Sequence, residues 1–336
     1  MIQVSDLEKI DTKMMFKTYN EWPKIGKESF EKKFEEVDVK SIDHIIFSGM
    51  GGSGTIGDVM KDILSKENIH VNITKGYTLP KTVDSKTLIV ATSVSGNTQE
   101  TLEILKQSKK TDAKIIAFSS GGEIEKFCMR EEILYQKISM EHSPRASFTK
   151  FLFYILNILK NIIPITKEEV FEAITLLEKT KIKISSDNLN SENNSLNIAK
   201  WIKNNPIIYY PRGLNSVATR FKNSLQENSK LHVISEEILE ACHNGIVAWS
   251  KNKEFQPILI RGKDDHEKTK ERWEILKEYF RKENIEFLEI NSVEGNIFSK
   301  IINLIYVLDY ASIYHAILHE IDPSPVDAIT FVKSKL

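Results

Sequence analysis

The pattern of hydrophobic and polar positions divides most of the chain into three stretches: two in which strand-like and helix-like runs alternate, and one between them with helical spacing only. Between residues 44 and 139, short apolar, β-branched runs alternate with longer segments whose apolar positions have helical spacing. The short runs are continuously apolar, which is typical of strands buried on both faces of a parallel sheet. We therefore predict an α/β domain with a parallel sheet flanked by helices. The expected strands cover residues 44–50, 70–76, 87–95, 113–120 and 133–139.

Strand-like runs are missing from residues 148–203, where three helices are expected, and they return after residue 205. The last stretch therefore predicts a second α/β half. We predict an N-terminal domain at 1–152 with a helical lead-in, connecting helices at 153–204, and a C-terminal domain at 205–336. Strands of the second half are expected at 206–213, 230–237, 255–262 and 285–291, and its helices at 214–228, 265–283 and 295–320.

The two strand-rich halves can be aligned on their first strands. Placing Ile45-Ile46-Phe47 over Ile207-Ile208-Tyr209 sets Gly51 over Gly213 and Ser53 over Asn215. Each stretch then has the order strand, tight loop, helix. This alignment indicates an internal duplication whose second copy has lost its loop chemistry.

Composition and charge argue against several classes of protein, among them nucleic-acid-binding, disulfide-rich and membrane-spanning proteins. The 336 residues suffice for about two domains, and a net charge of −1 provides no general field for nucleic acid or anionic lipid. Two cysteines, Cys128 and Cys242, are too few for a disulfide framework or a zinc site. Charges interrupt the N-terminus where a signal peptide needs apolar residues, and no apolar stretch is long enough to span a membrane. We therefore expect a soluble cytoplasmic protein without a bound metal.

A glycine-rich loop, Phe47-Ser-Gly-Met-Gly-Gly-Ser-Gly-Thr55, follows the first strand and precedes a helix. Such a loop lets backbone N–H groups approach an anion at the helix N-terminus. Gly49-x-Gly51-x-x-Gly54 also fits the dinucleotide fingerprint, but the second strand ends in Thr74-Lys75-Gly76 without the expected acid. The missing acid disfavours a dinucleotide site. NADP binding nevertheless stays open as an alternative, because Lys75 would suit a 2′-phosphate. A loop that only permits tight packing is the third alternative.

A second loop, Ser93-Val-Ser-Gly-Asn-Thr98, follows the third strand and opens the next helix. Three hydroxyl groups at a helix N-terminus suit a phosphate monoester, and a dinucleotide fold has no use for them there. The alternative is a simple helix cap by Ser95 or Thr98, which needs only one hydroxyl.

GMGGSGTIGD and SVSGNTQETL together resemble the sugar isomerase (SIS) domain. Later segments make the chain similar to the bifunctional phosphoglucose/phosphomannose isomerase family of archaea and bacteria. These segments run in the family's order from about residue 47 to the last residue. They are Ser143-Pro-Arg-Ala146, Pro211-Arg-Gly213, RFKNSLQENSK at 220–230, His243-Asn244, Asp322-Pro-Ser-Pro325 and Lys333-Ser-Lys-Leu336.

The resemblance implies two flavodoxin-like SIS domains. It also implies a homodimer that interconverts glucose 6-phosphate, mannose 6-phosphate or both with fructose 6-phosphate, without metal or organic cofactor. Proton transfer between C1 and C2 needs a base, a group for ring opening and positive charge for the enediolate. The resemblance places these at Glu227 (base), His243 (ring opening, in the neighbouring subunit's site), Arg145 (enediolate and O1) and Lys333 (ring oxygen). It assigns phosphate binding to Gly51, Gly52, Ser53, Ser93, Ser95 and Thr98.

The chain departs from the family pattern at two loops. The family usually has tyrosine where Val94 stands, and it often reads Asn-His-Asn-Glu where this chain has Cys242-His243-Asn244-Gly245. Two other functions stay open. A non-catalytic sugar-phosphate sensor would lack Glu227 or His243, and an NADP-dependent oxidoreductase would use the glycine loop.

His315 and His319 lie four residues apart on a predicted helix. They could share a face as metal ligands, but the acid of the H-E-x-x-H motif is missing. We expect a buried or interfacial pair.

Overall fold

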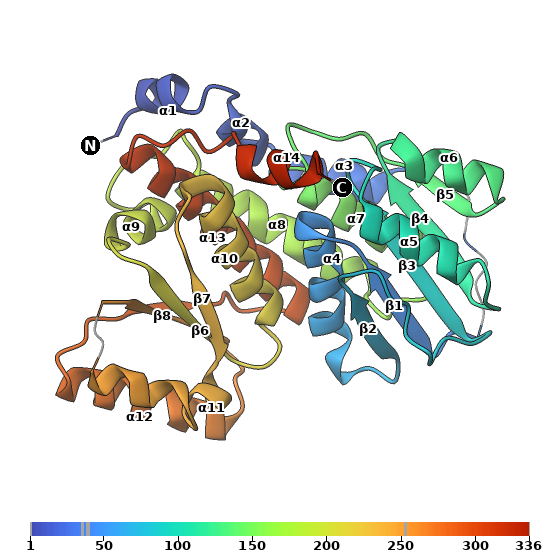
Figure 1. Cartoon of the computed structure of the whole chain (residues 1–336). Coiled ribbons are helices and arrows are strands. Elements are labelled where there is room, and N and C mark those ends of the chain that lie inside the picture. Colours follow the sequence, from blue (N-terminus) through green and yellow to red (C-terminus); the bar gives the residue numbers. More distant parts are fainter. Residues whose placement is uncertain (1, 35–36, 38–40, 252–253, 336) are drawn as a thin grey trace. The chain divides into compact units, whose positions relative to one another are not determined.

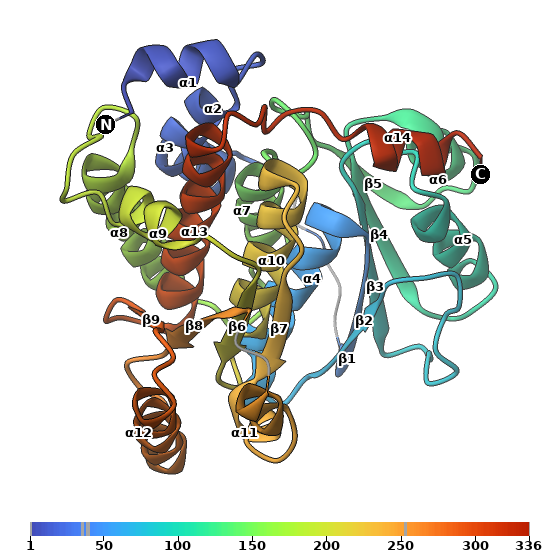
Figure 2. The same cartoon turned by 60° about the vertical axis from the view of Figure 1, so that its left-hand side comes forward.

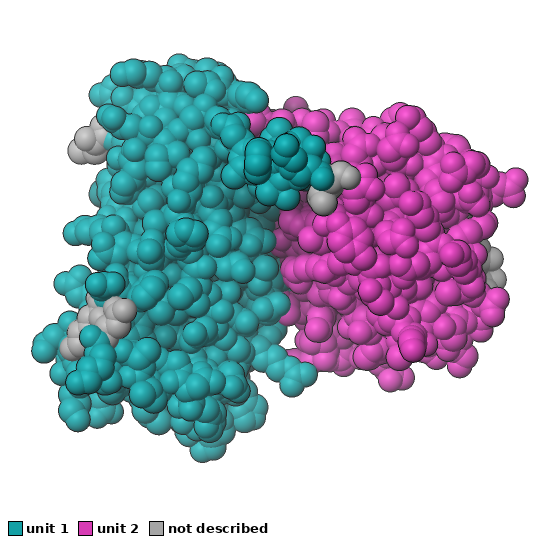
Figure 3. All heavy atoms as spheres, viewed as in Figure 1, with its two compact units in different colours: residues 1–20, 175–336 teal, residues 21–174 magenta. Residues whose placement is uncertain are grey.

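The computed structural model describes residues 2–34, 37, 41–251 and 254–335. The chain forms two compact units, residues 21–174 and residues 1–20 with 175–336 (Figure 3). Each unit is described by itself below. The boundary at residue 174 falls inside a helix, α8 (Lys167–Ile184), so the predicted division at 152 and 204 stays a prediction.

The unit of residues 21–174 contains a five-stranded parallel sheet with strand order β2-β1-β3-β4-β5 (Figure 1). This is the order of flavodoxin-like folds, as expected. The central strands β1 and β3 are buried along their whole length, which explains their continuously apolar sequences. The elements are α3 (Trp22–Glu31), β1 (His44–Ser48), α4 (Gly51–Ile63), η1 (Leu64–Lys66), β2 (His70–Thr74), β3 (Thr87–Ser93), α5 (Gln99–Ser108), β4 (Lys114–Ser119), α6 (Gly122–Arg130), β5 (Leu134–Lys137) and α7 (Phe148–Ile158).

The other unit contains a four-stranded parallel sheet in the order β7-β6-β8-β9. This order repeats that of the first four strands of the other sheet, as a duplication would. The elements of the unit are α1 (Val4–Ile10), α2 (Met15–Asn20), α9 (Asn194–Trp201), β6 (Pro206–Tyr210), α10 (Asn215–Ser229), β7 (Ile234–Glu237), α11 (Ile238–Ala241), η2 (Gly245–Ser250), β8 (Gln256–Arg261), α12 (Glu267–Lys282), β9 (Leu288–Asn291), α13 (Ile297–Leu318) and α14 (Asp327–Lys333), with most of α8.

Helix α13 is the central helix of this unit and packs against α10 and α9 (Figure 2). Contrary to the expectation from the sequence, it is by length and composition long and apolar enough to cross a membrane, but 89% of its apolar window is buried inside the protein. A core helix passes the same test of length and composition, so α13 is weak evidence for a membrane span.

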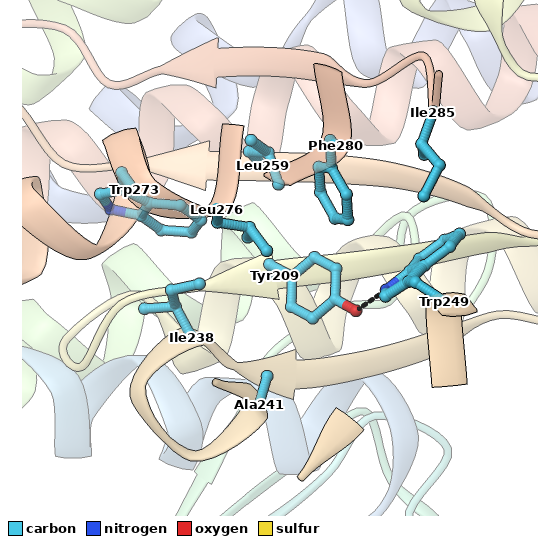
Figure 4. Close-up of a cluster of buried hydrophobic side chains, with 9 residues drawn as sticks. All are labelled: Tyr209, Ile238, Ala241, Trp249, Leu259, Trp273, Leu276, Phe280 and Ile285. Atoms are coloured by element: carbon cyan, nitrogen blue, oxygen red, sulfur yellow. Dashed lines mark hydrogen bonds between the residues drawn. The ribbon is translucent and has the colours of Figure 1, made fainter. Parts of the chain in front are cut away.

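An aromatic cluster packs α12 and η2 against the sheet of this unit (Figure 4). Trp249 of η2 donates its indole N–H to the Tyr209 hydroxyl at 2.9 Å. Burial raises the pKa of Tyr209 to about 12, so the hydroxyl stays neutral as the acceptor. The cluster thereby fixes η2, which begins two residues after His243.

The predicted α/β class and both parallel sheets are confirmed. Each of the nine expected strands is present, although most are shorter than the apolar runs that predicted them. The short helices α11 and α14 and the 3-10 turn η2 were not predicted, because each spans seven residues or fewer and shows little periodicity.

Candidate active site

The turn after β1 and the first turn of α4 contain Gly49, Gly51, Gly52 and Gly54, and three of these glycines have a role that the structure explains. A Cβ atom at Gly49 would lie 2.9 Å from the Thr92 carbonyl oxygen, and one at Gly54 would lie 2.8 Å from the Gly49 carbonyl oxygen. These two glycines therefore allow close backbone packing. Gly51 has φ +53° and open space where a Cβ would stand. Its surroundings are compatible with the approach of a ligand to the N-terminus of α4.

The loop after β3 is shaped by its own hydroxyl groups. Ser93 Oγ accepts the Gly96 N–H at 3.1 Å and lies 2.7 Å from Thr98 Oγ1. Ser95 Oγ accepts the Asn97 N–H in a long contact of 3.4 Å. Thr98 is the N-cap residue of α5, yet its side chain makes no capping hydrogen bond. The cap alternative therefore does not account for Thr98.

Two helix N-termini meet at these loops. Ser53 Oγ, in the first turn of α4, accepts the Val94 N–H from the loop before α5 at 3.2 Å. Neither α4 nor α5 has a side-chain cap, and the first N–H groups of a helix have no intrahelical acceptor. Unpaired N–H groups and two helix dipoles favour an anion at this position. This geometry suits the phosphate monoester predicted from the sequence.

Gly121 and Gly122, which were not singled out in the sequence, pack against the second loop. Gly96 has φ +73°, and a Cβ there would lie 1.7 Å from the Gly121 carbonyl oxygen. A Cβ at Gly122 would lie 2.5 Å from Asn97 Oδ1, which accepts the Glu123 N–H. The available signal was the Gly121-Gly122 pair, which begins two residues after the end of β4.

Lys75 is engaged within the same unit. Its ammonium donates to both carboxylate oxygens of the buried Asp58 at 2.8 and 2.6 Å. A lysine that neutralises a buried carboxylate is poorly placed to bind a 2′-phosphate. The geometry therefore weighs against the NADP alternative.

Arg145 lies in the turn before α7, in the unit that carries the two loops. It is 4% exposed, and its carbonyl accepts the Phe148 N–H at 3.4 Å. Arginine retains its charge when buried, so this turn supplies a fixed cation.

Glu227 lies near the end of α10, and the motif around it has a structural explanation. Arg220, Ser224 and Asn228 are spaced four residues apart and share a buried face. Arg220 Nη2 and Ser224 Oγ donate to the Asp309 carboxylate of α13 at 2.7 and 2.6 Å. Asn228 Nδ2 donates to the Ser312 hydroxyl at 2.8 Å. These bonds fix α10 on α13 and leave Glu227 half-buried outside that face.

Burial alone would lower the pKa of the Arg220 guanidinium, but the adjacent Asp309 carboxylate outweighs this effect and raises it. Arg220 therefore stays charged inside the unit. The motif RFKNSLQENSK thus combines a buried anchoring face with the candidate base.

His243 is exposed and follows α11 in a short loop. Its backbone N–H donates to the Glu240 carbonyl at 2.9 Å. The side chains four residues to either side, Leu239 and Val247, are 39% and 69% exposed. His243 thus lies in an exposed segment that also carries exposed aliphatic side chains.

Gly245 stands where the family often has glutamate, and in this chain another carboxylate lies close to that position. A Cβ at Gly245 would lie 2.5 Å from Glu236 Oε2, an atom with no hydrogen-bond partner among the described residues. The carboxylate of Glu236, from β7, thus occupies the space where a side chain at 245 would begin. Val94, the other departure, is 2% exposed and contributes its backbone N–H to the loop contact.

Lys333 is the last residue of α14 and is exposed. Glu227, His243 and Lys333 belong to the unit of residues 1–20 and 175–336, whereas Arg145 and the phosphate loops belong to the other unit. Within the described part of the chain, no group of three His, Cys, Asp or Glu residues could hold a metal ion. His315 and His319 stack at 4.1 Å, and His319 Nδ1 donates to the His315 carbonyl.

Family models match both halves of the chain. The SIS domain model matches residues 39–156, and the model of the bacterial phospho-glucose isomerase C-terminal SIS domain matches residues 191–336. The chain is 31% identical to the bifunctional phosphoglucose/phosphomannose isomerase of Caldicellulosiruptor bescii, covering 92% of this chain and 96% of that protein. It is 30% identical to the D-glucosamine-6-phosphate 4-epimerase of Sulfolobus acidocaldarius, covering 73% and 77%.

Solved structures show the same architecture at low sequence identity. A hypothetical protein from Thermus thermophilus superposes with a TM-score of 0.73 at 13% identity, covering 98% of this chain and 92% of that one. The C-terminal domain of glucosamine-fructose-6-phosphate aminotransferase from Francisella tularensis gives a TM-score of 0.67 at 17% identity, covering 90% and 95%. At these identities the likeness concerns the fold alone.

Proposed function

The chain belongs to the bifunctional phosphoglucose/phosphomannose isomerase family, and on this basis we propose that it interconverts glucose 6-phosphate and mannose 6-phosphate with fructose 6-phosphate. The observation that carries the proposal is the pair of uncapped helix N-termini, α4 and α5, joined by the Ser53–Val94 hydrogen bond. Such a cradle suits the phosphate that these substrates share.

The catalytic roles are those that the resemblance to the family implies, and the chemistry of the side chains is compatible with them. Glu227 is proposed to move the proton between C1 and C2, and His243 to open the sugar ring near neutral pH. The Arg145 guanidinium would stabilise the enediolate and O1, and Lys333 would assist at the ring oxygen. All four groups are side chains, so the proposed proton transfers call for neither a metal nor an organic cofactor.

The assembly proposed is a homodimer in which His243 serves the site of the neighbouring subunit. Support comes from the exposure of His243 and of two aliphatic side chains in the segment around it, Leu239 and Val247. Exposed apolar side chains suit burial against a second copy of the chain. The hexose 6-phosphate is the proposed ligand, and neither nucleic acid nor a membrane is a proposed partner.

A coupled assay for fructose 6-phosphate, with glucose 6-phosphate and mannose 6-phosphate offered separately, tests the proposal. We expect turnover of both. A third arm with glucosamine 6-phosphate is informative, because a relative at 30% identity is a 4-epimerase of that sugar. Binding of either hexose 6-phosphate without turnover would favour a sensor, and tight NADPH binding in a fluorescence titration would favour the oxidoreductase.

A further inference from the structure

Lys230 directly follows α10 and has a left-handed backbone, with φ +57°. Its N–H donates to the Leu225 carbonyl, which closes the helix. Helices commonly end in this conformation, but glycine or asparagine is the usual residue. A lysine in this conformation carries a steric cost that glycine would avoid. A role of the Lys230 side chain would explain why lysine stands at this position.

The ammonium of Lys230 lies among five backbone carbonyl oxygens from two separate segments. It contacts the carbonyls of Glu227 and Asn228, at the end of α10, at 2.7 and 3.5 Å. From the C-terminal segment 322–325 it contacts those of Pro325, Asp322 and Pro323 at 2.8, 3.3 and 3.5 Å. A cation at a helix C-terminus is favoured by the helix dipole, and the second segment adds further negative carbonyl ends.

The segment that Lys230 contacts is itself fixed. Thr12 Oγ1 donates to Asp322 Oδ2 at 2.6 Å, and the Ser324 N–H donates to Asp322 Oδ1 at 2.9 Å. Two residues after Pro325 the chain enters α14, which ends at Lys333. Lys230 is therefore the side chain that links the carbonyl of the candidate base, Glu227, to the segment leading to Lys333.

We propose that Lys230 is a positioning residue for the isomerase reaction: it holds the end of α10, and with it Glu227, against segment 322–325. The inference rests on the proposed function. Lys230 does not act as a substrate ligand, because five carbonyl oxygens already exceed its three N–H donors. Removing the ammonium leaves the carboxylate of Glu227 intact and loosens its placement, so the chemical step suffers more than binding.

The test uses Lys230→Gly, since glycine adopts the left-handed conformation freely and the substitution removes only the side chain. Lys230→Asn is the second variant, because asparagine also tolerates this conformation. Lys222→Gln, on the same helix, is the matched control for loss of one positive charge. We expect kcat for both hexose 6-phosphates to fall by about 10- to 100-fold with KM changed less than about twofold. Lys222→Gln should retain the wild-type kcat.

Two readouts separate positioning from general stability. Ethylammonium added to Lys230→Gly should restore part of the lost kcat. Amide hydrogen exchange should accelerate in residues 322–333 without a matching change in β6 or β8. An unchanged kcat, an effect confined to KM, or unchanged exchange in 322–333 would each overturn the positioning role. If the wild-type protein turns over no hexose 6-phosphate, the proposed function itself is overturned. This assay needs no variant, so its failure is distinguishable from failure of the positioning role.

Discussion

At the scale of single residues, the hydroxyl groups that look equivalent in the sequence have different tasks. Ser53 and Ser93 accept N–H groups from the loop before α5, so they help to build the cradle. Ser95 is half-buried and its Oγ accepts the Asn97 N–H in a long contact, which leaves the hydroxyl proton able to donate to an anion. The resemblance treated all of these residues as ligands, whereas in the structure Ser53 and Ser93 accept N–H groups of the loop itself.

Ser95→Ala should therefore weaken substrate binding without disturbing the loop. A hydrogen bond to a charged group is worth about 1.5–3 kcal/mol, so kcat/KM should fall roughly 10- to 100-fold, mainly through KM. Steady-state kinetics with either hexose 6-phosphate measures this. Ser65→Ala, whose hydroxyl bonds to the Asp62 carbonyl at the far end of α4, is the matched control. An unchanged KM in Ser95→Ala would contradict a phosphate contact.

Glu227→Gln should abolish both isomerisations together. Glucose 6-phosphate and mannose 6-phosphate differ only at C2 and give the same planar enediolate once the C2 proton leaves. The amide retains the shape of the carboxylate and removes its basicity, so kcat should fall by about 10²–10⁴-fold while the sugar phosphate still binds. Assays on both substrates, with calorimetric titration of binding, provide the measurement. Loss of one activity alone would show that two different bases operate.

At the scale of elements, the strands were predictable because short, continuous apolar runs between helical segments are typical of the buried strands of a parallel sheet. The position of the two loops was predictable for a related reason: their glycines and hydroxyls lie at the ends of β1 and β3. The packing of Gly121-Gly122 against the second loop was not predictable, because only the folded chain brings Gly96 against the Gly121 carbonyl. Nor did periodicity reveal that Asp309, an acid within an apolar helix, is the anchor for Arg220.

Helix α13 also contains a pH-sensitive group, His315. Burial first, and then the neighbouring His319, lower the pKa of His315 from 6.5 to about 4. Between these pH values the unfolded chain binds a proton that the native protein excludes, so stability falls as the pH drops from 6.5 towards 4. The full effect is up to about 3 kcal/mol.

Urea unfolding at several pH values, with wild type and His315→Gln compared, measures this effect. The variant should lose most of the slope between pH 6.5 and 4, because glutamine takes up no proton there. His319→Gln, at an exposed position, removes the smaller of the two causes and leaves the burial of His315, so it should reduce the slope only in part. Parallel pH dependences for wild type and His315→Gln would place the titrating group elsewhere.

At the scale of the whole molecule, two sheets of like order have diverged in chemistry. The turn after β1 retains Gly51-Gly52-Ser53, whereas the corresponding turn after β6 has Gly213, with φ +92°, followed by Leu214-Asn215. The first copy presents uncapped helix N-termini beside hydroxyl groups, and the second presents a carboxylate at the other end of its first helix. Duplication thus supplied two scaffolds, and each is proposed to have specialised in one half of the reaction: anchoring the phosphate or moving the proton.

The last prediction concerns the proposed dimer. If His243 serves the neighbouring subunit, Glu227→Gln and His243→Ala homodimers each lack one group in every site. A hybrid dimer has one site that lacks both groups and one site in which both are intact. Mixing the two inactive proteins should therefore restore activity, up to about one quarter of wild type when random exchange makes half of the dimers hybrid. Native mass spectrometry of the mixture verifies the exchange, and the coupled assay measures the recovery. No recovery despite verified hybrids would show that both residues act in the site of their own subunit, because every site in the mixture would then still lack one of them.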